Sequence, residues 1–247
     1  MYFMISQELV NNINNYFNTF RIEPFTIGDF PIIYFGNEEE YRNSPKKIVT
    51  VGKNPSHIEF DRGNNNSFLR FPNWNPIDNN IIEILNSYFE IAPYTRWFNS
   101  LEPLLNGLDA SFYPGNHFRN RAIHTDICSP IATNPTWTGL TRHQRENLLR
   151  NGTSLWTNLV RELDPDLIIA SIPVDLVHQY ITPQLNNILT SFQQENQVYN
   201  VYLEESRILG RNRFLLFGRA AITPFQPITN IQKSQVGQLT RRTIWPA

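Results

Sequence analysis

Ile48-Val49-Thr50-Val51-Gly52-Lys53-Asn54-Pro55-Ser56-His57 is a short apolar run that stops at a glycine and then turns on Asn-Pro. Four residues rich in β-branched side chains, ended by Gly52, indicate a buried strand that delivers a polar loop to one edge of a sheet. Gly52 lets the backbone approach a ligand, and the proline holds Asn54 in an extended conformation. The Asn54 amide can orient a water molecule, and Ser56 and His57 offer further polar groups. Taken alone, such a pattern is most often only a turn.

A second segment has the same organisation. Ala122-Ile123-His124-Thr125-Asp126-Ile127-Cys128-Ser129-Pro130 is a short apolar strand that runs into a polar loop, and Thr133-Asn134-Pro135-Thr136-Trp137 follows it. If the two strands are parallel neighbours, their loops lie side by side at one edge of the sheet. The two loops together therefore predict one functional site.

In this order and spacing, the two segments resemble the first motif and the base-reading strand of the uracil-DNA glycosylase superfamily. The motif residues are 52–56 and 124–130, and the nearest branches are the single-strand-selective and mismatch-specific ones. The resemblance extends from about Ile48 to Ile172, roughly half of the chain. It implies an enzyme that takes a base out of the DNA stack and hydrolyses its N-glycosidic bond.

The length and charge of the chain limit the number of domains and the kinds of partner that can be expected. With 247 residues, 40% of them hydrophobic, the chain can bury a substantial core and fits a single α/β domain over residues 1–247. From Ser206 onward there are seven Arg and Lys residues and no Asp or Glu, which leaves a charge of −8 for the rest of the chain. This distribution indicates either a chance cluster on a solvated face or a phosphate-binding surface.

Several classes of protein lack support in the sequence. The single Cys128 excludes an internal disulfide framework and suits a reducing compartment. The first ten residues are too short and polar for a secretory signal, and no apolar stretch approaches the ~20 residues of a membrane helix. There is no dinucleotide or P-loop motif and no Cys/His cluster with metal spacing. We expect a cytoplasmic monomer that needs no metal and no organic cofactor and does not bind membranes.

The periodicity of apolar residues predicts the elements. Helices are expected over residues 6–20, with Ser6 as a possible N-cap, and over 77–91, 94–105 and 141–163, with an interrupted helix over 174–192. Beyond the two motif strands, further strands are expected at residues 32–35, 167–172, 198–203 and 214–217. This alternation predicts a three-layer α/β/α fold with a central, mainly parallel four-stranded sheet. Residues 221–247 have few apolar anchors and are expected to wrap the surface.

The resemblance assigns the two central roles in the site. Asn54 matches the position that orients the attacking water. Asp126 falls where the family commonly has an Asn that reads the pyrimidine edge. An ionised carboxylate accepts hydrogen bonds and cannot donate them, so it suits the N4 amine of cytosine and disfavours the O4 of uracil or thymine. Because removal of ordinary cytosine would damage the host genome, a modified cytosine is the expected base.

Other roles for Asp126 remain open. Asp126 can activate the water, which would compensate for an Asn rather than an Asp at position 54 of the first motif. Alternatively, it can be protonated in its pocket and donate to O4. A structural role, in which Asp126 caps a loop, is a common fate for a lone Asp.

The family's third motif often carries His-Pro-Ser, whose His stabilises the leaving base. The corresponding region, residues 218–225, has no His, as in the mismatch-specific branch. His57 or Arg219 can supply positive charge instead, although a solvated surface role suits each equally well. The resemblance places Thr223 in the loop that pushes the nucleotide out, with Phe225 as the wedge.

Aromatic residues after the first motif are candidates for stacking on the extruded base. Phe68 and Phe71 match this role, although each is individually more often a core residue. Arg70, between them, is expected to face a phosphate. The base pocket is completed by residues that flank the two motifs, Gly52, Ser56 and His124.

The resulting prediction is a monofunctional DNA glycosylase, acting on single- or double-stranded DNA in repair or in defence against phage. Lys53 is the only Lys in either motif, and the pattern does not place it as a Schiff-base nucleophile, so no strand cleavage is expected. The alternatives are a glycosylase for uracil or thymine mismatches and a catalytically silent module that binds modified bases.

Overall fold

The computed structural model describes residues 5–77, 80–194, 197–208, 210–220 and 222–246. Within it, the chain forms two compact units, and it passes between them several times. The first unit comprises Met1–Arg42, Gly52–Tyr94 and Ile123–Asp164, and the second comprises Asn43–Val51, Thr95–Ala122 and Pro165–Ala247. The single domain expected for residues 1–247 stays a prediction.

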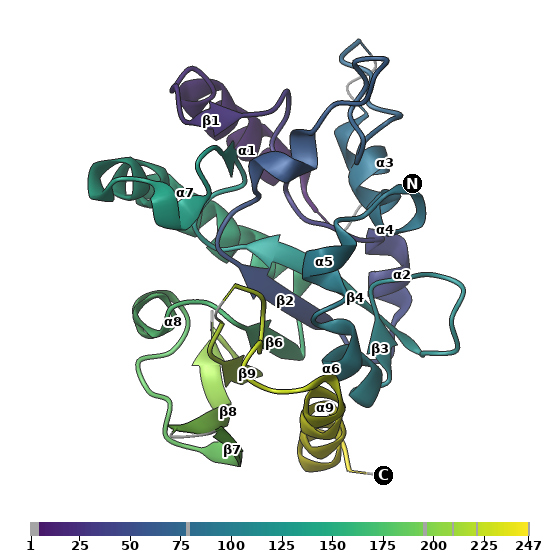
Figure 1. The fold of residues 1–247 in the computed structure, drawn as a ribbon, viewed down its shortest axis with the longest axis vertical. Coiled ribbons are helices and arrows are strands. Elements are labelled where there is room, and N and C mark those ends of the chain that lie inside the picture. The colour runs from purple at the N-terminus through teal and green to yellow at the C-terminus, as the bar shows by residue number, and fades with distance from the viewer. Residues whose placement is uncertain (1–4, 78–79, 195–196, 209, 221, 247) are drawn as a thin grey trace. The chain divides into compact units, whose positions relative to one another are not determined.

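A mainly parallel sheet confirms the mixed α/β class. Among the described residues its strand order is β3-β4-β2-β6-β9-β8-β7, as labelled in Figure 1. The inner strands pair in parallel, with Ile48 of β2 opposite Leu167 of β6 and Leu167 opposite Phe214 of β9. The bounds are β2 Ile48–Gly52, β3 Ala110–Ser111, β4 Asn120–Asp126, β6 Leu167–Ala170, β7 Ile188–Gln194, β8 Gln197–Ile208 and β9 Arg211–Gly218.

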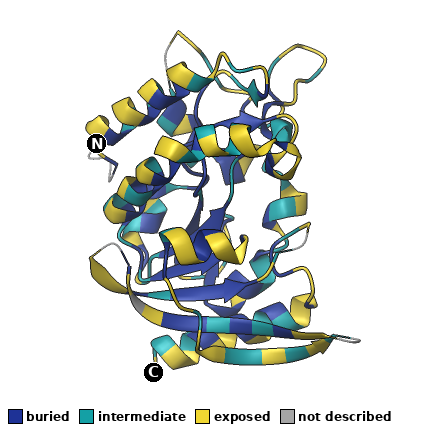
Figure 2. Ribbon diagram, turned by 90° about the vertical axis from the view of Figure 1, so that its left-hand side faces the viewer, coloured by how far each residue is buried: buried dark blue, intermediate teal, exposed yellow. Residues whose placement is uncertain are grey.

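The sheet is larger than the four strands expected, and the sequence pattern predicted no strand at β7 or at the short β3. Residues 174–192 were expected to form an interrupted helix, but α8 (Val174–Tyr180) ends before Pro183, and residues from Ile188 onward form β7. β7 pairs antiparallel with β8, which in turn pairs antiparallel with β9. Figure 2 shows most of the sheet in dark blue, whereas this edge carries half-buried and exposed residues. Backbone pairing thus decided the structure of a segment whose side chains are mostly exposed.

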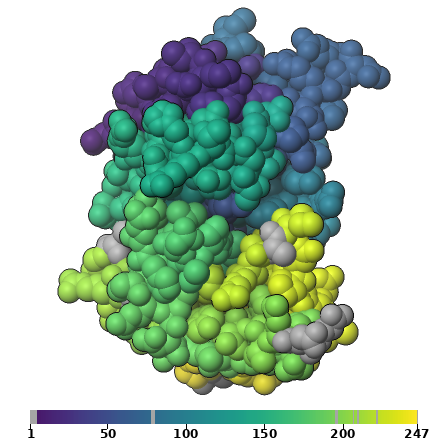
Figure 3. Space-filling model, turned by 60° about the vertical axis from the view of Figure 1, so that its left-hand side comes forward, coloured from purple at the N-terminus to yellow at the C-terminus, as the bar shows by residue number. Residues whose placement is uncertain are grey.

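The first unit contains the two helices that the sequence indicates most clearly. α1 (Gln7–Phe20) begins at the N-cap Ser6, whose side chain accepts from the Leu9 amide, and α7 (Arg142–Leu163) begins with a capping box between Thr141 and Gln144. The two helices pack against each other, and Figure 3 shows α1 in purple beside the blue-green surface of α7. The unit also contains α2 (Glu38–Asn43), α3 (Ile81–Asn86), α4 (Tyr88–Ile91), the 3₁₀ turns η1 (His57–Phe60) and η2 (Trp137–Gly139), and the paired strands β1 (Thr26–Ile27) and β5 (Ala132–Thr133).

Helix α7 holds the second polar loop in place. Gly152 faces this loop, where a Cβ atom would collide with the Cys128 carbonyl oxygen. One turn further on, the indole of Trp156 donates a 3.0 Å hydrogen bond to the Thr125 hydroxyl. Helix α7 therefore contacts the chain on both sides of Asp126, the last residue of β4.

The second unit contains helices α5 (Thr95–Phe98), α6 (Glu102–Gly107), α8 and α9 (Asn230–Ile244). Residues 94–105 were expected to be one helical stripe and form two short helices instead. Residues 221–247 were expected to wrap the surface, but most of them form α9, which packs against α6. The expected strand at residues 32–35 is reduced to an isolated bridge between Phe35 and His124. None of the described helices is long and apolar enough to cross a membrane.

Candidate functional site

The two polar loops lie side by side, as expected for parallel neighbours. At the end of β2 the Gly52 carbonyl accepts a 3.0 Å hydrogen bond from the Ile127 amide, and the Lys53 carbonyl accepts a 2.8 Å bond from the Cys128 amide. Further on, Ser56 and Thr133 form a parallel bridge. These contacts lie within the first unit and bring the segments of Asn54 and Asp126 together.

The side-chain amide of Asn54 is fixed in one orientation. Its Nδ2 donates to the carbonyl oxygens of Pro55 at 2.9 Å and Ile131 at 3.2 Å, and lies 3.0 Å from the Thr133 hydroxyl. Because carbonyl oxygens only accept hydrogen bonds, only the NH₂ group fits on this side. Oδ1 is left as an acceptor that makes no hydrogen bond with any described residue. This atom suits the role of holding a water molecule.

Asp126 is a nearly buried carboxylate without a hydrogen-bond donor in the described part of the chain. Its side chain is 5% exposed, and its Oδ1 lies 3.8 Å from Nε2 of the equally buried His124. That separation is too long for a hydrogen bond. His124 lies within ion-pair distance of Asp126, but no described residue donates a hydrogen bond to the carboxylate, so its oxygens can accept from water or a ligand.

Gly52 makes room for these two side chains. A Cβ atom at this position would lie 2.5 Å from Asp126 Oδ1 and 2.9 Å from His124 Nε2. The sequence suggested that the glycine admits a ligand, but its immediate neighbours are two side chains of β4. Gly52 therefore acts on the site through Asp126 and His124.

The first polar loop continues into η1, which carries His57. The Nδ1 atom of His57 is buried and has no hydrogen-bond partner among the described residues. The Ser56 side chain, just before this turn, is half-buried and makes no hydrogen bond that caps η1. Both residues follow Asn54 closely and belong to the same unit.

Glu59, two residues beyond His57, is an ionisable group that the sequence interpretation missed. It is 4% exposed and accepts a 2.6 Å hydrogen bond from the Tyr88 hydroxyl. Burial raises its pKa to about 7, while the Tyr88 hydrogen bond and the charge of Arg70 lower it and the charge of Asp126 raises it. The signal in the sequence was an acidic residue flanked by the apolar Ile58 and Phe60.

Lys53, to which the sequence assigned no role, also belongs to the first polar loop. Burial lowers its pKa, and the nearby charges of Cys128 and Asp126 act in the opposite direction. The candidate site therefore contains a half-buried cation close enough to Asp126 to sense its charge.

The structure corrects the stacking role expected for Phe68 and Phe71. Both rings are buried, at 4% and 2% exposure, and pack edge-on against Phe30. The guanidinium of Arg62 covers the Phe68 ring at 4.1 Å from its centroid, and Tyr88 lies against Phe71. These aromatic contacts leave both rings in the core.

Arg70 is also not a free phosphate ligand. Its Nη1 donates to the carbonyl oxygens of Ala92 at 3.2 Å and Pro93 at 3.3 Å, and its guanidinium lies over the Tyr94 ring. Its Nε is buried without a partner in the described chain. The expected phosphate contact is thus replaced by contacts to the backbone.

Three of the expected DNA-binding residues belong to the second unit. Arg219 is exposed, and Thr223 is half-buried with its amide bonded to Gln226 Oε1 at 3.0 Å. Phe225 is fully buried, its amide donates to the Ser171 hydroxyl, and its ring occupies the space where a Cβ atom of Gly218 would lie. The wedge role expected for Phe225 is therefore corrected, because the ring is part of the core.

The basic residues after Ser206 do not form one exposed surface. Arg213 and Lys233 are buried, at 3% and 4% exposure. Arg211 pairs with Asp166 at 3.1 Å, and Arg241 lies 3.6 Å from Asp109. The excess of positive charge is thus divided between buried, paired and exposed positions.

Among the described residues, no group of three or more His, Cys, Asp or Glu side chains is arranged to hold a metal ion. No protein-family model matches the chain, and no curated protein matches it either. The functional interpretation therefore rests on the residues and their geometry.

Proposed function

We propose that the chain is a monofunctional DNA glycosylase that removes a cytosine-like, modified pyrimidine and leaves an abasic site. The observation that carries the proposal is the Asp126 carboxylate at the end of β4, 5% exposed and without a hydrogen-bond donor among the described residues, beside the loop of Asn54. The resemblance of the two motifs supplies the chemistry in which such a pair takes part.

Asp126 recognises the base in this proposal. A cytosine-type base presents an exocyclic amine, which donates hydrogen bonds, and Asp126 presents a carboxylate, which accepts them. A uracil or thymine presents O4 at the same place, and two acceptors repel each other. The missing partner of Asp126 is thus the amine of the extruded base.

Asn54 positions the nucleophile. Its NH₂ group is held by two backbone carbonyls, so that Oδ1 can accept a hydrogen bond from water. An amide is too weak a base to take the proton fully, and its contribution is orientation of the water towards the C1′ atom of the sugar.

The reaction breaks the bond between C1′ and the base nitrogen. The electron pair leaves with the base, water adds to the sugar cation, and the proton lost by water balances the charge of the departing base. His57, with its buried and unpartnered Nδ1, and the nearby Lys53 are the groups that support the negative charge on the base.

The wider proposal follows the sequence interpretation. The protein acts as a cytoplasmic monomer on DNA, without metal or organic cofactor, and its fold is a three-layer α/β/α arrangement. Light scattering on the purified chain measures the oligomeric state, for which one chain per particle is expected.

A substrate panel tests the activity. Duplexes and single strands containing uracil, a thymine mismatch, cytosine, hydroxymethylcytosine or glucosylated hydroxymethylcytosine are incubated with the protein, and alkali-labile sites are separated on a gel. We expect cleavable sites in at least one modified-cytosine substrate. Asn54→Ala should slow the reaction about 10²-fold or more, because the attacking water would no longer be oriented and misplacement of a reactant reduces the rate by a factor of this size. The exposed Asn64→Ala serves as the control and should retain the wild-type rate.

The same panel can overturn the proposal. If no substrate yields abasic sites while modified DNA still binds, the chain is a binding module and the enzymatic proposal is wrong.

A further inference from the structure

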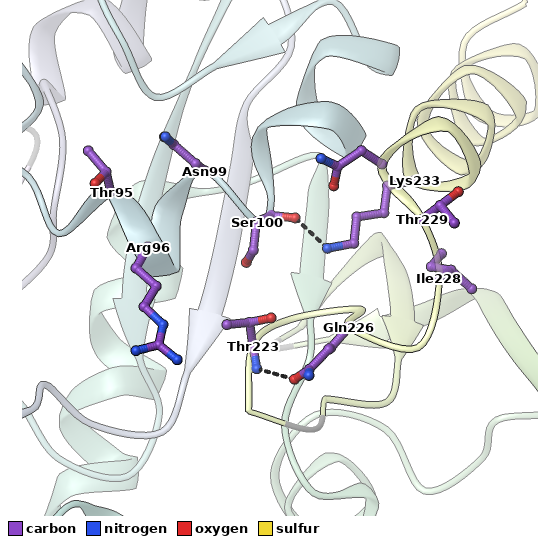
Figure 4. Close-up of a pocket in the computed structure, with 10 residues that line it drawn as sticks. Thr95, Arg96, Asn99, Ser100, Thr223, Gln226, Ile228, Thr229 and Lys233 are labelled. Carbon is purple, nitrogen blue, oxygen red and sulfur yellow. Dashed lines mark hydrogen bonds between the residues drawn. The ribbon is translucent and has the colours of Figure 1, made fainter.

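A pocket in the second unit has a lining rich in hydrogen-bond donors. Its volume is about 580 Å³, and it lies between α5, the following turn and the segment that leads into α9 (Figure 4). Two of its ten lining residues, Arg96 and Lys233, are cationic, and none is acidic. The lining therefore favours an anionic ligand.

Lys233 is a buried ammonium group without a counter-charge. It is 4% exposed, and its Nζ donates to the carbonyl oxygens of Ser100 at 2.8 Å and Pro224 at 3.0 Å. The ammonium group has three donors, and no described residue accepts the third or provides a carboxylate in ion-pair range. Burial lowers the pKa of Lys233 to about 8, so it remains mainly protonated at neutral pH. Buried charges are normally paired, so an anion in the pocket would supply what the chain lacks.

Arg96 provides a second positive charge from α5. It is exposed and makes no hydrogen bond or ion pair with the described chain. Figure 4 shows its side chain reaching towards the loop of Thr223, while Lys233 reaches from α9 towards Ser100. The two cations come from different elements, and both line the same pocket.

Two neutral side chains that line the pocket have free donor groups. Gln226 Oε1 accepts from the amides of Ile222 at 2.7 Å and Thr223 at 3.0 Å, which leaves its NH₂ group available. The Thr229 hydroxyl accepts from the Gln232 amide at the start of α9 and can still donate its own proton. The first turn of α9 contains no acidic residue, and its helix dipole also favours an anion.

We propose that this pocket binds a phosphate group. Phosphate matches the lining because its several acceptor oxygens can take charge-assisted bonds from the cations Lys233 and Arg96 and further bonds from neutral donors such as Gln226. The group can belong to a nucleic-acid strand or to a free phosphorylated molecule, and the recognition chemistry is the same. The proposal rests on the second unit alone and does not depend on glycosylase activity.

Two binding measurements on the full chain test the proposal and separate the two sources. Calorimetric titration with inorganic phosphate measures affinity for the free group, and fluorescence anisotropy with a labelled single-stranded oligonucleotide measures affinity for a strand. The variants are Arg96→Gln, at an exposed position that should not disturb folding, and Lys233→Gln, which keeps a donor for the two carbonyls. Arg242→Gln, an exposed arginine in the last turn of α9, is the matched control.

We expect Arg96→Gln and Lys233→Gln to weaken binding about tenfold in at least one assay and Arg242→Gln to leave it within twofold. A nucleic-acid strand is the indicated ligand if the variants bind the oligonucleotide more weakly. In that case the slope of log affinity against log salt concentration should also become shallower by about the contribution of one phosphate contact. A free phosphorylated ligand is indicated if only inorganic phosphate binding weakens. If Arg96→Gln binds both probes as tightly as the wild type, or if neither probe binds the wild type, the proposal is wrong.

Discussion

Gly52 shows how a residue without a side chain shapes the chemistry of its neighbours. The space above its Cα atom is occupied by the Asp126 carboxylate and the His124 ring, both nearly buried. Any larger residue would have to displace these two groups. The functional geometry of the site is therefore sensitive to the smallest change at this position.

Gly52→Ala should impair activity more than stability. The added methyl group meets the flexible ends of Asp126 and His124, which can move aside, so we expect a loss of about 1–3 kcal/mol in the free energy of unfolding. If Asp126 reads the base as proposed, displacement of its carboxylate should reduce turnover about 10²-fold. Urea denaturation and the gel assay measure the two effects, with Gly63→Ala in a loop as the control. If Gly52→Ala keeps full activity, the position of the Asp126 carboxylate is not important for turnover.

Glu59 makes stability depend on pH. The folded chain holds the proton up to about pH 7, whereas the unfolded chain releases it near 4.5. The folded state therefore binds more protons between these values, and the free energy of unfolding should fall by about 3 kcal/mol as pH rises from 4.5 to 7. Glu59→Gln should remove this contribution, whereas the exposed Glu90→Gln should keep it. Stability is measured from denaturation midpoints at pH 5 and pH 7.5. If stability changes equally between these pH values in the wild type and in Glu59→Gln, Glu59 is not the source of the pH dependence.

Among the helices, the best predicted were those with both a clear apolar period and a cap. α1 and α7 have both; the N-cap Ser6 was predicted, whereas the N-cap Thr141 was expected to be the first residue of its helix. α9 was missed because its buried positions are occupied by Lys233, Val236, Gly237 and Thr240, only one of which is strongly apolar. Their spacing of three and four residues was nevertheless a helical signal.

The packing of α9 on α6 depends on two glycines. A Cβ atom at Gly237 would collide with the Leu104 carbonyl oxygen, and one at Gly107 would collide with the Ser234 carbonyl oxygen. Because backbone atoms cannot move aside as side-chain ends do, Gly237→Ala should destabilise the protein by about 2–3 kcal/mol. Chemical denaturation of this variant and of the exposed Gln235→Ala measures the difference. Similar midpoints for both would show that the helices do not need this close approach.

Across the whole chain, the α/β class was predictable from alternating patterns, whereas the extent of the sheet was not. The parallel inner strands are continuous apolar runs, but β7 has exposed side chains and depends on its pairing with β8. The same distinction applies to the candidate site. The adjacency of the Asn54 and Asp126 loops followed from neighbouring strands, whereas the burial of Phe68, Phe71 and Phe225 depends on tertiary contacts that spacing along the chain does not reveal.

The most direct test of the central claim is the base preference of Asp126→Asn. The rate of base release is measured on matched oligonucleotides containing a modified cytosine or uracil, with the exposed Asp61→Asn as the control. An asparagine can donate to O4, so we expect the ratio of cytosine-type to uracil cleavage to fall about 10- to 100-fold, since a base contact is worth ~1–3 kcal/mol of discrimination. An unchanged ratio in Asp126→Asn would contradict the claim that this carboxylate reads the amine of the base.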